Sequence, residues 1–209
     1  MAQRGRRSPR LSGDDRYEAL LQAAEQLLDT RPLEGISIEE LATGAGISRS
    51  NFYFYFASKD EVLLALLDRV IAEVEARVAA LPREFTREPA AAWRRAIGAF
   101  VDVFSAHRGV SVAAIASRHR SADVLALWSS SMQTWVDYSR MVIQAEQDRG
   151  AAPAGISAHD LAITLTLMNE RVLMASLSGE SLAIDHASVL DVLSETWGRT
   201  IYGAAGSPS

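Results

Sequence analysis

The residues with the clearest chemical meaning stand together near the start of the sequence. Ser48, Arg49, Ser50 and Asn51 are followed by five aromatic residues in succession, Phe52 to Phe56, out of 15 aromatic residues in the 209-residue chain. An arginine can donate two hydrogen bonds to guanine and an asparagine can pair with adenine, while serine is compatible with either base. Tyrosine hydroxyls can hydrogen-bond to phosphate oxygens. The segment therefore combines groups that read base edges with groups that bind the DNA backbone.

The five aromatic rings cannot all belong to the core, because a helix directs successive side chains to different sides. We predict that Phe52 and Phe56, four residues apart, hold the segment to the core, and that Tyr53 and Tyr55 contact phosphates. Phe54 either contacts a thymine methyl group or packs inside the protein. Strand-like alternation occurs nowhere else in the chain, and a lone five-residue strand would have no partner, so the segment is predicted to be helical.

Two short helices would position this segment. Ser37 with Glu40 forms a capping box that begins a helix ending at Gly44, and Ser48 caps the next helix. Between them, residues 43–46 read Thr-Gly-Ala-Gly, where small side chains allow close packing and glycine allows a tight turn. This arrangement predicts a helix-turn-helix motif, in which the N-terminal residues of the second helix enter the major groove. Residues 15–29, with apolar side chains at three- and four-residue spacing, form the preceding helix.

Lys59, the single lysine of the chain, lies in the first turn of a long helix that Ser58 and Glu61 are predicted to cap. A cation at this end of a helix opposes the helix dipole. It either compensates a nearby negative charge, such as a phosphate, or is a surface lysine without a special role.

Positive charge is concentrated at the N-terminus although the net charge of the chain is −5. Residues 1–12 contain Arg4, Arg6, Arg7 and Arg10 and no acidic residue, so the other 197 residues carry −9. An arginine-rich arm on an acidic body is typical of a protein that touches phosphate at one end. The alternative is a disordered tail that aids solubility.

The remaining sequence is also predicted to be helical, which makes the fold class all-α. Further helices are expected from Ser58 towards Pro82, from Pro89 towards Gly109, and over residues 110–118, 121–149, 157–178 and 186–202. We predict four regions: a basic disordered arm (1–14), a helix-turn-helix DNA-binding domain (15–60), a ligand-binding and dimerisation domain (61–203) and a disordered tail (204–209).

Several classes of protein are not supported by the composition. Without cysteine there can be no disulfide or thiolate metal site. No apolar run approaches the roughly 18 residues of a membrane span, and no signal peptide is visible, so a cytoplasmic location without membrane contact is expected. No catalytic or nucleotide-binding motif occurs, and neither enzyme activity nor a cofactor is expected. The histidines lack metal-ligand spacing and are interpreted as surface or cap residues: His107, His119, His159 and His186.

The second half of the chain holds all four tryptophans. Trp128, Met132 and Trp135 recur at helical spacing, with Tyr138 and Ser139 just beyond. A second aromatic face consists of Trp93, Ile97, Phe100 and Phe104. Such faces are typical either of a filled core or of an apolar ligand pocket, and spacing alone favours the filled core.

Three stretches around the predicted helix-turn-helix form a recognisable signature: residues 38–42 (Ile-Glu-Glu-Leu-Ala), 45–48 (Ala-Gly-Ile-Ser) and 52–60. With them the sequence resembles the TetR family of transcriptional repressors, and the resemblance is closer to one member of that family. Matches to that member continue over 63–70 and 93–104 and at Leu127-Trp128, Trp135, 145–146, 148–153, 167–171, Gly179-Glu180 and 201–203. They cover roughly residues 15–203.

The resemblance implies a dimeric repressor that is released from a palindromic operator by a small apolar ligand. The last two helices would form the dimer, and a neighbouring flavin monooxygenase gene would be the target. It also implies a narrow aromatic pocket with Asn169 as the polar anchor for an amide or ester group. Thr166 and Met174 stand where the similar member has Asn and Phe, and Ser50-Asn51 where Pro-Thr is expected. A helical carrier of lipids or small molecules without DNA binding is the alternative.

These arguments define two sets of candidate site residues. The DNA-binding set is Ser37, Thr43, Ser48, Arg49, Ser50, Asn51, Tyr53, Phe54, Tyr55, Lys59 and the arginines at 4, 6, 7 and 10. The ligand-binding set is Trp93, Ile97, Phe100, Phe104, Trp128, Met132, Trp135, Tyr138, Ser139, Thr166, Asn169, Glu170, Leu173, Met174 and Trp197. Glu170 is either buried or one partner of an exposed pair with Arg171.

Overall fold

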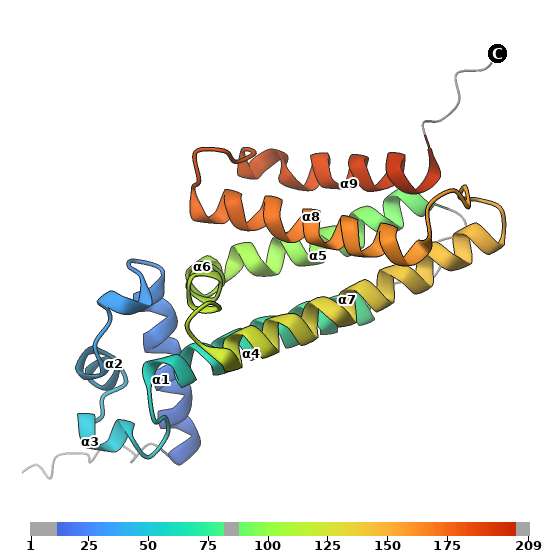
Figure 1. Cartoon of the computed structure of the whole chain (residues 1–209). Coiled ribbons are helices and arrows are strands. Elements are labelled where there is room, and N and C mark those ends of the chain that lie inside the picture. Colours follow the sequence, from blue (N-terminus) through green and yellow to red (C-terminus); the bar gives the residue numbers. More distant parts are fainter. Residues whose placement is uncertain (1–11, 82–87, 204–209) are drawn as a thin grey trace, which may run out of the picture.

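The computed structural model describes residues 12–81 and 88–203, and these residues form an all-helical protein, as predicted (Figure 1). The elements are α1 (Gly13–Leu28), the 3₁₀ turn η1 (Leu33–Gly35), α2 (Ile38–Gly44), α3 (Arg49–Phe52), α4 (Lys59–Ala79), α5 (Pro89–Ala106), α6 (Arg108–Ser117), α7 (Ala122–Asp148), α8 (Ala158–Ser178) and α9 (His186–Tyr202). The arginines at 4, 6, 7 and 10, most of the predicted arm and the predicted tail lie outside the described residues.

The first three helices form a small head at one end of the molecule (Figure 1). The predicted capping box is present: the Ser37 hydroxyl accepts from the Glu40 amide, and the Glu40 carboxylate accepts from the Ser37 amide. The turn between α2 and α3 depends on Gly46, whose φ of +67° lies in the left-handed region that favours glycine. Ala42 and Ala45 are buried. The helix-turn-helix arrangement predicted from these small residues is therefore present.

The aromatic segment is less helical than predicted. Helix α3 ends at Phe52, and the backbone then tightens, since the amides of Phe54 and Tyr55 donate to carbonyls only three residues earlier. The segment from Tyr53 to Tyr55 is thus a turn rather than the rest of an α-helix. This turn still brings the ring of Phe56 beside that of Phe52, with 6.1 Å between ring centroids.

The cap of α4 also differs from the prediction. The Ser58 hydroxyl accepts from the Glu61 amide, as expected. The Glu61 carboxylate, however, accepts from the amide of Ala57 at 2.7 Å, one residue before the cap. Only one half of the predicted capping box is formed, because the carboxylate reaches the preceding amide instead.

Helix α4 leaves the head and runs beside α7 into a larger helical body (Figure 1). There, α7 packs against α8 and α5 packs against α9. The predicted boundary between residues 60 and 61 falls in the first turn of α4, which contacts both the head and the body. Within the described residues, no single helix is long and apolar enough to cross a membrane. Only α5 and α6 taken together have that length and apolarity, and they meet at a bend of 89°.

Candidate nucleic-acid interface and ligand cavity

The N-terminal half of α3 and its surroundings present polar side chains to solvent. The exposed residues include Ser37, Thr43, Ser48, Arg49, Ser50 and Asn51. Tyr53 is 49% exposed and Phe54 is 84% exposed, whereas Tyr55 is half-buried against the core. All of these predicted DNA-binding residues except Tyr55 therefore lie with open access to a partner. An exposed fraction of this size for a phenylalanine excludes packing of Phe54 inside the head.

The same segment is held in place by buried rings. Phe52 is fully buried and Phe56 is 5% exposed. The ring of Phe56 stacks on Tyr17 of α1 with centroids 5.1 Å apart. Ser48 caps the short helix by accepting from the Asn51 amide, and its hydroxyl lies 2.9 Å from that of Ser50. As predicted, Phe52 and Phe56 hold the segment to the core, while other rings of the segment are exposed.

The structure gives Lys59 a role that neither interpretation of its sequence position predicted. Its ammonium group donates hydrogen bonds to the backbone carbonyls of Leu33, Glu34 and Ile36, at 2.7, 3.2 and 3.1 Å. These carbonyls lie in and just after η1, so the lysine ties the turn to the start of α4. An ammonium group has three protons, and all three are used here. Lys59 therefore does not offer a free proton to phosphate in this conformation, which corrects the predicted role.

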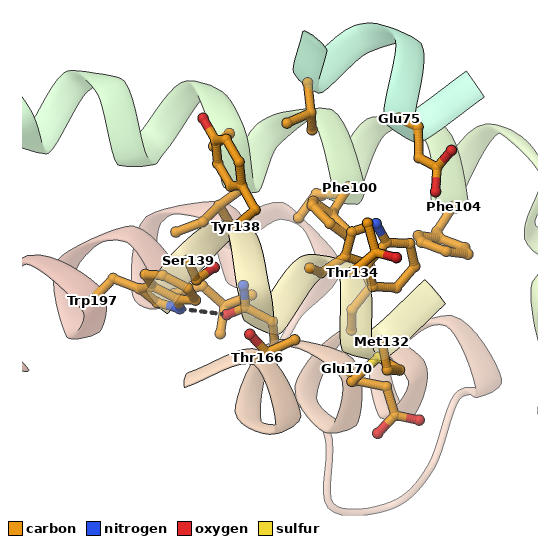
Figure 2. A pocket seen from close by; sticks show the side chains of 18 of the residues that line it. Glu75, Phe100, Phe104, Met132, Thr134, Tyr138, Ser139, Thr166, Glu170 and Trp197 are labelled. Atoms are coloured by element: carbon orange, nitrogen blue, oxygen red, sulfur yellow. Dashed lines mark hydrogen bonds between the residues drawn. The ribbon is translucent and has the colours of Figure 1, made fainter. Parts of the chain in front are cut away.

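All fifteen predicted ligand-binding residues line a single cavity of about 370 Å³ in the body (Figure 2). Helices α4, α5, α7, α8 and α9 contribute its walls. Further lining residues, which the sequence analysis did not identify, are Glu75, Val78, Ala79, Ala96, Val101, Thr134 and Leu193. The helix faces thus enclose a space instead of the filled core that spacing alone favoured. Its volume lies within the range of small-molecule sites, about 300–1,000 Å³.

The rings on α5 and α7 form one aromatic wall. The Phe100 and Trp135 rings meet edge to face with centroids 4.6 Å apart, and Phe104 lies 5.8 Å from Trp128 by the same measure. In Figure 2, Phe100 and Phe104 lie on one side of the cavity, and Trp197 lies on the other. Edge-to-face contacts of this kind stabilise ring orientation beyond simple burial. The wall is therefore preformed.

Few polar groups interrupt this wall, and most of them have partners. The Trp197 indole N–H donates to the side-chain oxygen of Asn169 at 2.8 Å (Figure 2). This bond uses the side-chain oxygen of Asn169 as acceptor and so fixes the orientation of the amide, whose NH₂ group is a donor. At the end of α9, the Trp93 indole N–H donates to the Tyr202 hydroxyl at 3.1 Å. Burial raises the pKa of Tyr202 to about 12.

Glu170 is largely buried, with 13% of its side chain exposed. Its partner is Arg118 of α6, at 2.8 Å, while Arg171 pairs with Glu180. The exposed pair of Glu170 with Arg171 considered from the sequence is thus not formed, because consecutive residues of a helix point in different directions.

The exposed residues among the described cavity lining lie on α4 and α7. They are Glu75 and Ala79 on α4 and Thr134 on α7. No other charged residue besides Glu75 and Glu170 lines the described cavity. The most accessible part of the lining is therefore on the helix that leads to the head and on the helix that carries Trp135.

A charged junction joins this body to the head. His107, at the bend between α5 and α6, hydrogen-bonds through one ring nitrogen to Glu25 of α1 and through the other to Glu73 of α4, at 3.2 Å in the second case. The sequence analysis predicted a surface or cap residue and missed these two contacts, because both partners are distant in the sequence. Next to it, the Arg108 side chain donates to the Leu177 carbonyl of α8 at 2.7 Å.

Charge on His107 is expected to make stability depend on pH. Partial burial lowers the pKa of His107, but the hydrogen bonds to Glu25 and Glu73 outweigh it, so the pKa is raised above 6.5. The protonated ring thus stabilises the fold at pH values below about 6.5, and this contribution is lost as pH rises through the higher pKa of the folded state. We expect a loss of below about 1 kcal/mol, because the group is partly exposed.

Urea unfolding between slightly acidic and alkaline pH measures this effect. The His107→Gln variant keeps a polar side chain that does not titrate, and its stability should change less over the same interval. Equal pH dependence in the two proteins would assign the effect to other groups.

Comparisons with known proteins agree with this geometry. The family model of bacterial regulatory proteins of the tetR family matches residues 20–66, and the model of the C-terminal domain of the transcriptional regulator EthR matches residues 93–203. The HTH-type transcriptional regulator EthR of Mycobacterium tuberculosis is 50% identical over 203 residues, which cover 96% of this chain and 93% of that protein. The EthR of Mycolicibacterium smegmatis is 42% identical over 200 residues, covering 96% and 92% of the two chains.

Solved structures show the same fold at low sequence identity. A crystal structure of a putative transcriptional regulator from Saccharomonospora viridis, in complex with choline, has a TM-score of 0.73 and 18% identity and covers 90% of this chain and 98% of that one. The fatty acid degradation regulator FadR from Bacillus halodurans has a TM-score of 0.69 and 11% identity and covers 95% of this chain and 100% of that one.

Proposed function

The chain belongs to the TetR family of bacterial regulatory proteins, carries an EthR-type C-terminal domain and is therefore a helix-turn-helix transcriptional regulator. We propose that it acts as a dimeric repressor that a ligand releases from DNA. The observation that carries the proposal is the division of the aromatic segment. Phe52 and Phe56 are buried, while Arg49, Asn51 and Tyr53 are exposed beside them. Such a surface suits insertion into a major groove.

Contacts with the operator are assigned from side-chain chemistry. Arg49 reads guanine and Asn51 reads adenine, while Tyr53 and Tyr55 bind phosphates with their hydroxyls. Phe54 provides an apolar contact to a thymine methyl group, consistent with its exposure of 84%. Ser37, Thr43, Ser48 and Ser50 add hydrogen bonds to the backbone or bases from the same surface. The arginine-rich arm adds phosphate contacts.

Dimerisation is assigned to α8 and α9, as the resemblance implies. Leu167 of α8 and Val192 of α9 are 52% and 41% exposed, which leaves apolar surface on the outside of both helices. Four such helices from two copies would cover this surface. The dimer would then present two α3 helices to successive major grooves about 34–36 Å apart.

Release is assigned to a small apolar ligand in the cavity. Glu75, Val78 and Ala79 of α4 line the same space as Phe100 and Trp135. A ligand that spreads these walls would tilt α4, which begins in the head, and so change the spacing of the two α3 helices. To move a balance of 1:99 to 99:1, the ligand must favour the released state by about 5.5 kcal/mol.

The resemblance also supports a target gene. Repressors of the EthR type lie beside a flavin monooxygenase gene and silence it, and we propose a similar neighbour for this regulator. Gel-shift assays with the intergenic DNA next to the gene for this protein test the proposal. A retarded complex is expected, and small apolar compounds should dissolve it. Equal retardation of unrelated DNA, or none, would favour a carrier that does not bind an operator.

Replacement of Arg49 by alanine tests the assignment of base contacts. The variant should lose about 1–3 kcal/mol of discrimination between the operator and a site changed at the contacted base. Thermal unfolding should be unchanged, because the side chain is exposed. Competition binding with paired oligonucleotides measures the discrimination. Unchanged preference in a folded variant would remove Arg49 from base reading.

A further inference from the structure

Two polar atoms in the ligand cavity have no partner within the protein. The indole N–H of Trp135 and the hydroxyl of Thr166 are buried without a hydrogen bond. Trp135 is 8% exposed and Thr166 is 6% exposed, and both line the cavity, one from α7 and the other from α8. Buried polar groups in folded proteins are almost always hydrogen-bonded. Two such exceptions on the walls of one cavity indicate groups that a ligand satisfies.

The surroundings of the Trp135 ring show why the protein does not supply a partner for its N–H. The Trp135 ring packs edge to face against Phe100, with centroids 4.6 Å apart, and lies 6.1 Å from Phe104. These neighbours are aromatic hydrocarbons and offer no strong acceptor for an N–H. The sulfur of Met132, another lining residue, is only a weak acceptor. The Trp135 N–H is therefore available to an acceptor on a ligand.

The charges around the cavity restrict this ligand further. Its two charged lining residues are the carboxylates Glu75 and Glu170, and no arginine, lysine or histidine is among the described lining residues. Arg118 already forms an ion pair with Glu170, so its charge is not available to a ligand. A ligand carboxylate would enter an apolar site without a positive partner, which is strongly unfavourable.

We propose that the effector is an uncharged molecule whose hydrogen-bond acceptor binds the Trp135 indole N–H, with Thr166 as a second polar contact, and that the site excludes carboxylate-bearing lipids and aromatic acids. This inference rests on the proposed function of the cavity and adds a contact to the Asn169 amide. Thr166 can donate or accept, so a carboxamide, which has both an acceptor and donors, suits the pair.

Three compounds with the same ring and a closely matched chain test the proposal: phenylbutanamide, phenylbutanoate and butylbenzene. Calorimetric titration of the wild-type protein at neutral pH is expected to show tighter binding of the amide than of butylbenzene, and binding of the carboxylate at least about tenfold weaker than that of the amide. Trp135→Phe keeps the ring and removes the N–H. It should reduce amide affinity by about threefold to tenfold, while butylbenzene binds as before.

Two further variants serve as comparisons. Thr166→Val removes the hydroxyl at nearly constant size and should also reduce amide affinity selectively. Trp128→Phe makes the same ring change on α7 at an indole whose nitrogen is not among the buried unpartnered atoms of the described residues, and should not be selective.

The outcomes separate this inference from the proposed function. If the carboxylate binds as tightly as the amide, or if Trp135→Phe leaves the amide preference intact, the inference is wrong, although butylbenzene binding still supports a ligand cavity. If none of the compounds binds, both the inference and the ligand-released repressor are contradicted. None of these titrations contains DNA, so they are independent of operator binding.

Discussion

Replacement of Phe52 by alanine is expected to lower the free energy of unfolding by about 4 kcal/mol. Phe52 is fully buried and contacts the rings of Tyr53 and Phe56, so its removal leaves a cavity at the centre of the small head. Helix α3 has only four residues and depends on this anchor for its position. DNA binding should therefore be lost together with the stability of the head. Urea unfolding followed by circular dichroism, and binding to operator DNA, measure both effects.

Phe54→Ala is the matched control, two residues away in the same segment. Its side chain is 84% exposed, so the free energy of unfolding should change by less than about 0.5 kcal/mol. Operator affinity should fall, because the apolar contact with DNA is lost. Equal destabilisation by the two substitutions would show that the segment is packed inside the molecule, and the DNA-binding interpretation would then lose its basis.

Replacement of Gly109 by alanine is expected to destabilise the protein by about 2–3 kcal/mol. An added Cβ would lie 2.6 Å from the Leu28 carbonyl carbon and 2.7 Å from the Asp29 nitrogen, and both are backbone atoms. The start of α6 therefore approaches the end of α1 so closely that only glycine fits. Because the contact joins the body to the head, relief of the clash would move the two apart. Release of the operator by ligand should then weaken as well.

Gly98→Ala provides the control within a buried helix. A Cβ at Gly98 would meet the Leu190 side chain at 3.8 Å, an ordinary van der Waals distance. This substitution should stabilise α5 by about 0.5–1 kcal/mol, since alanine is the better helix former. If Gly109→Ala is as stable as Gly98→Ala, the close approach of α6 to α1 is not maintained in solution.

The position of Gly109 suggests how the cavity communicates with the head. Phe100 and Phe104 line the cavity on α5, which ends at the bend that contains His107. His107 contacts both α1 and α4, and Gly109 touches the backbone at the end of α1. In the proposed release by ligand, a displacement of α5 would therefore act on the head through this bend as well as through α4.

Local features of the sequence predicted much of this structure. Ser37 with Glu40 formed the predicted capping box, because both bonds join residues three apart. The cavity walls were predictable because helical spacing places Trp128, Met132 and Trp135 on one face. Resemblance to EthR then indicated that the faces enclose a pocket, a conclusion that spacing alone did not favour.

Contacts between distant residues could not be predicted in this way. Lys59 binds carbonyls 23 to 26 residues away, and His107 binds Glu25 across 82 residues. Neither pattern is visible in sequence spacing, because the packing of the helices alone brings the groups together. The end of α3 at Phe52 is a similar case, since burial of Phe56 against Tyr17 decides the path of the turn.

The central claim, that the surface around α3 binds DNA, is tested most directly by the salt dependence of operator binding. Fluorescence anisotropy of labelled intergenic DNA, titrated with the protein between 50 and 200 mM salt, gives the affinity at each concentration. For about 6–10 phosphate contacts, affinity should fall by about 10³–10⁵ over this range. A fall of this size would support the claim, whereas an affinity independent of salt, or the absence of binding, would contradict it.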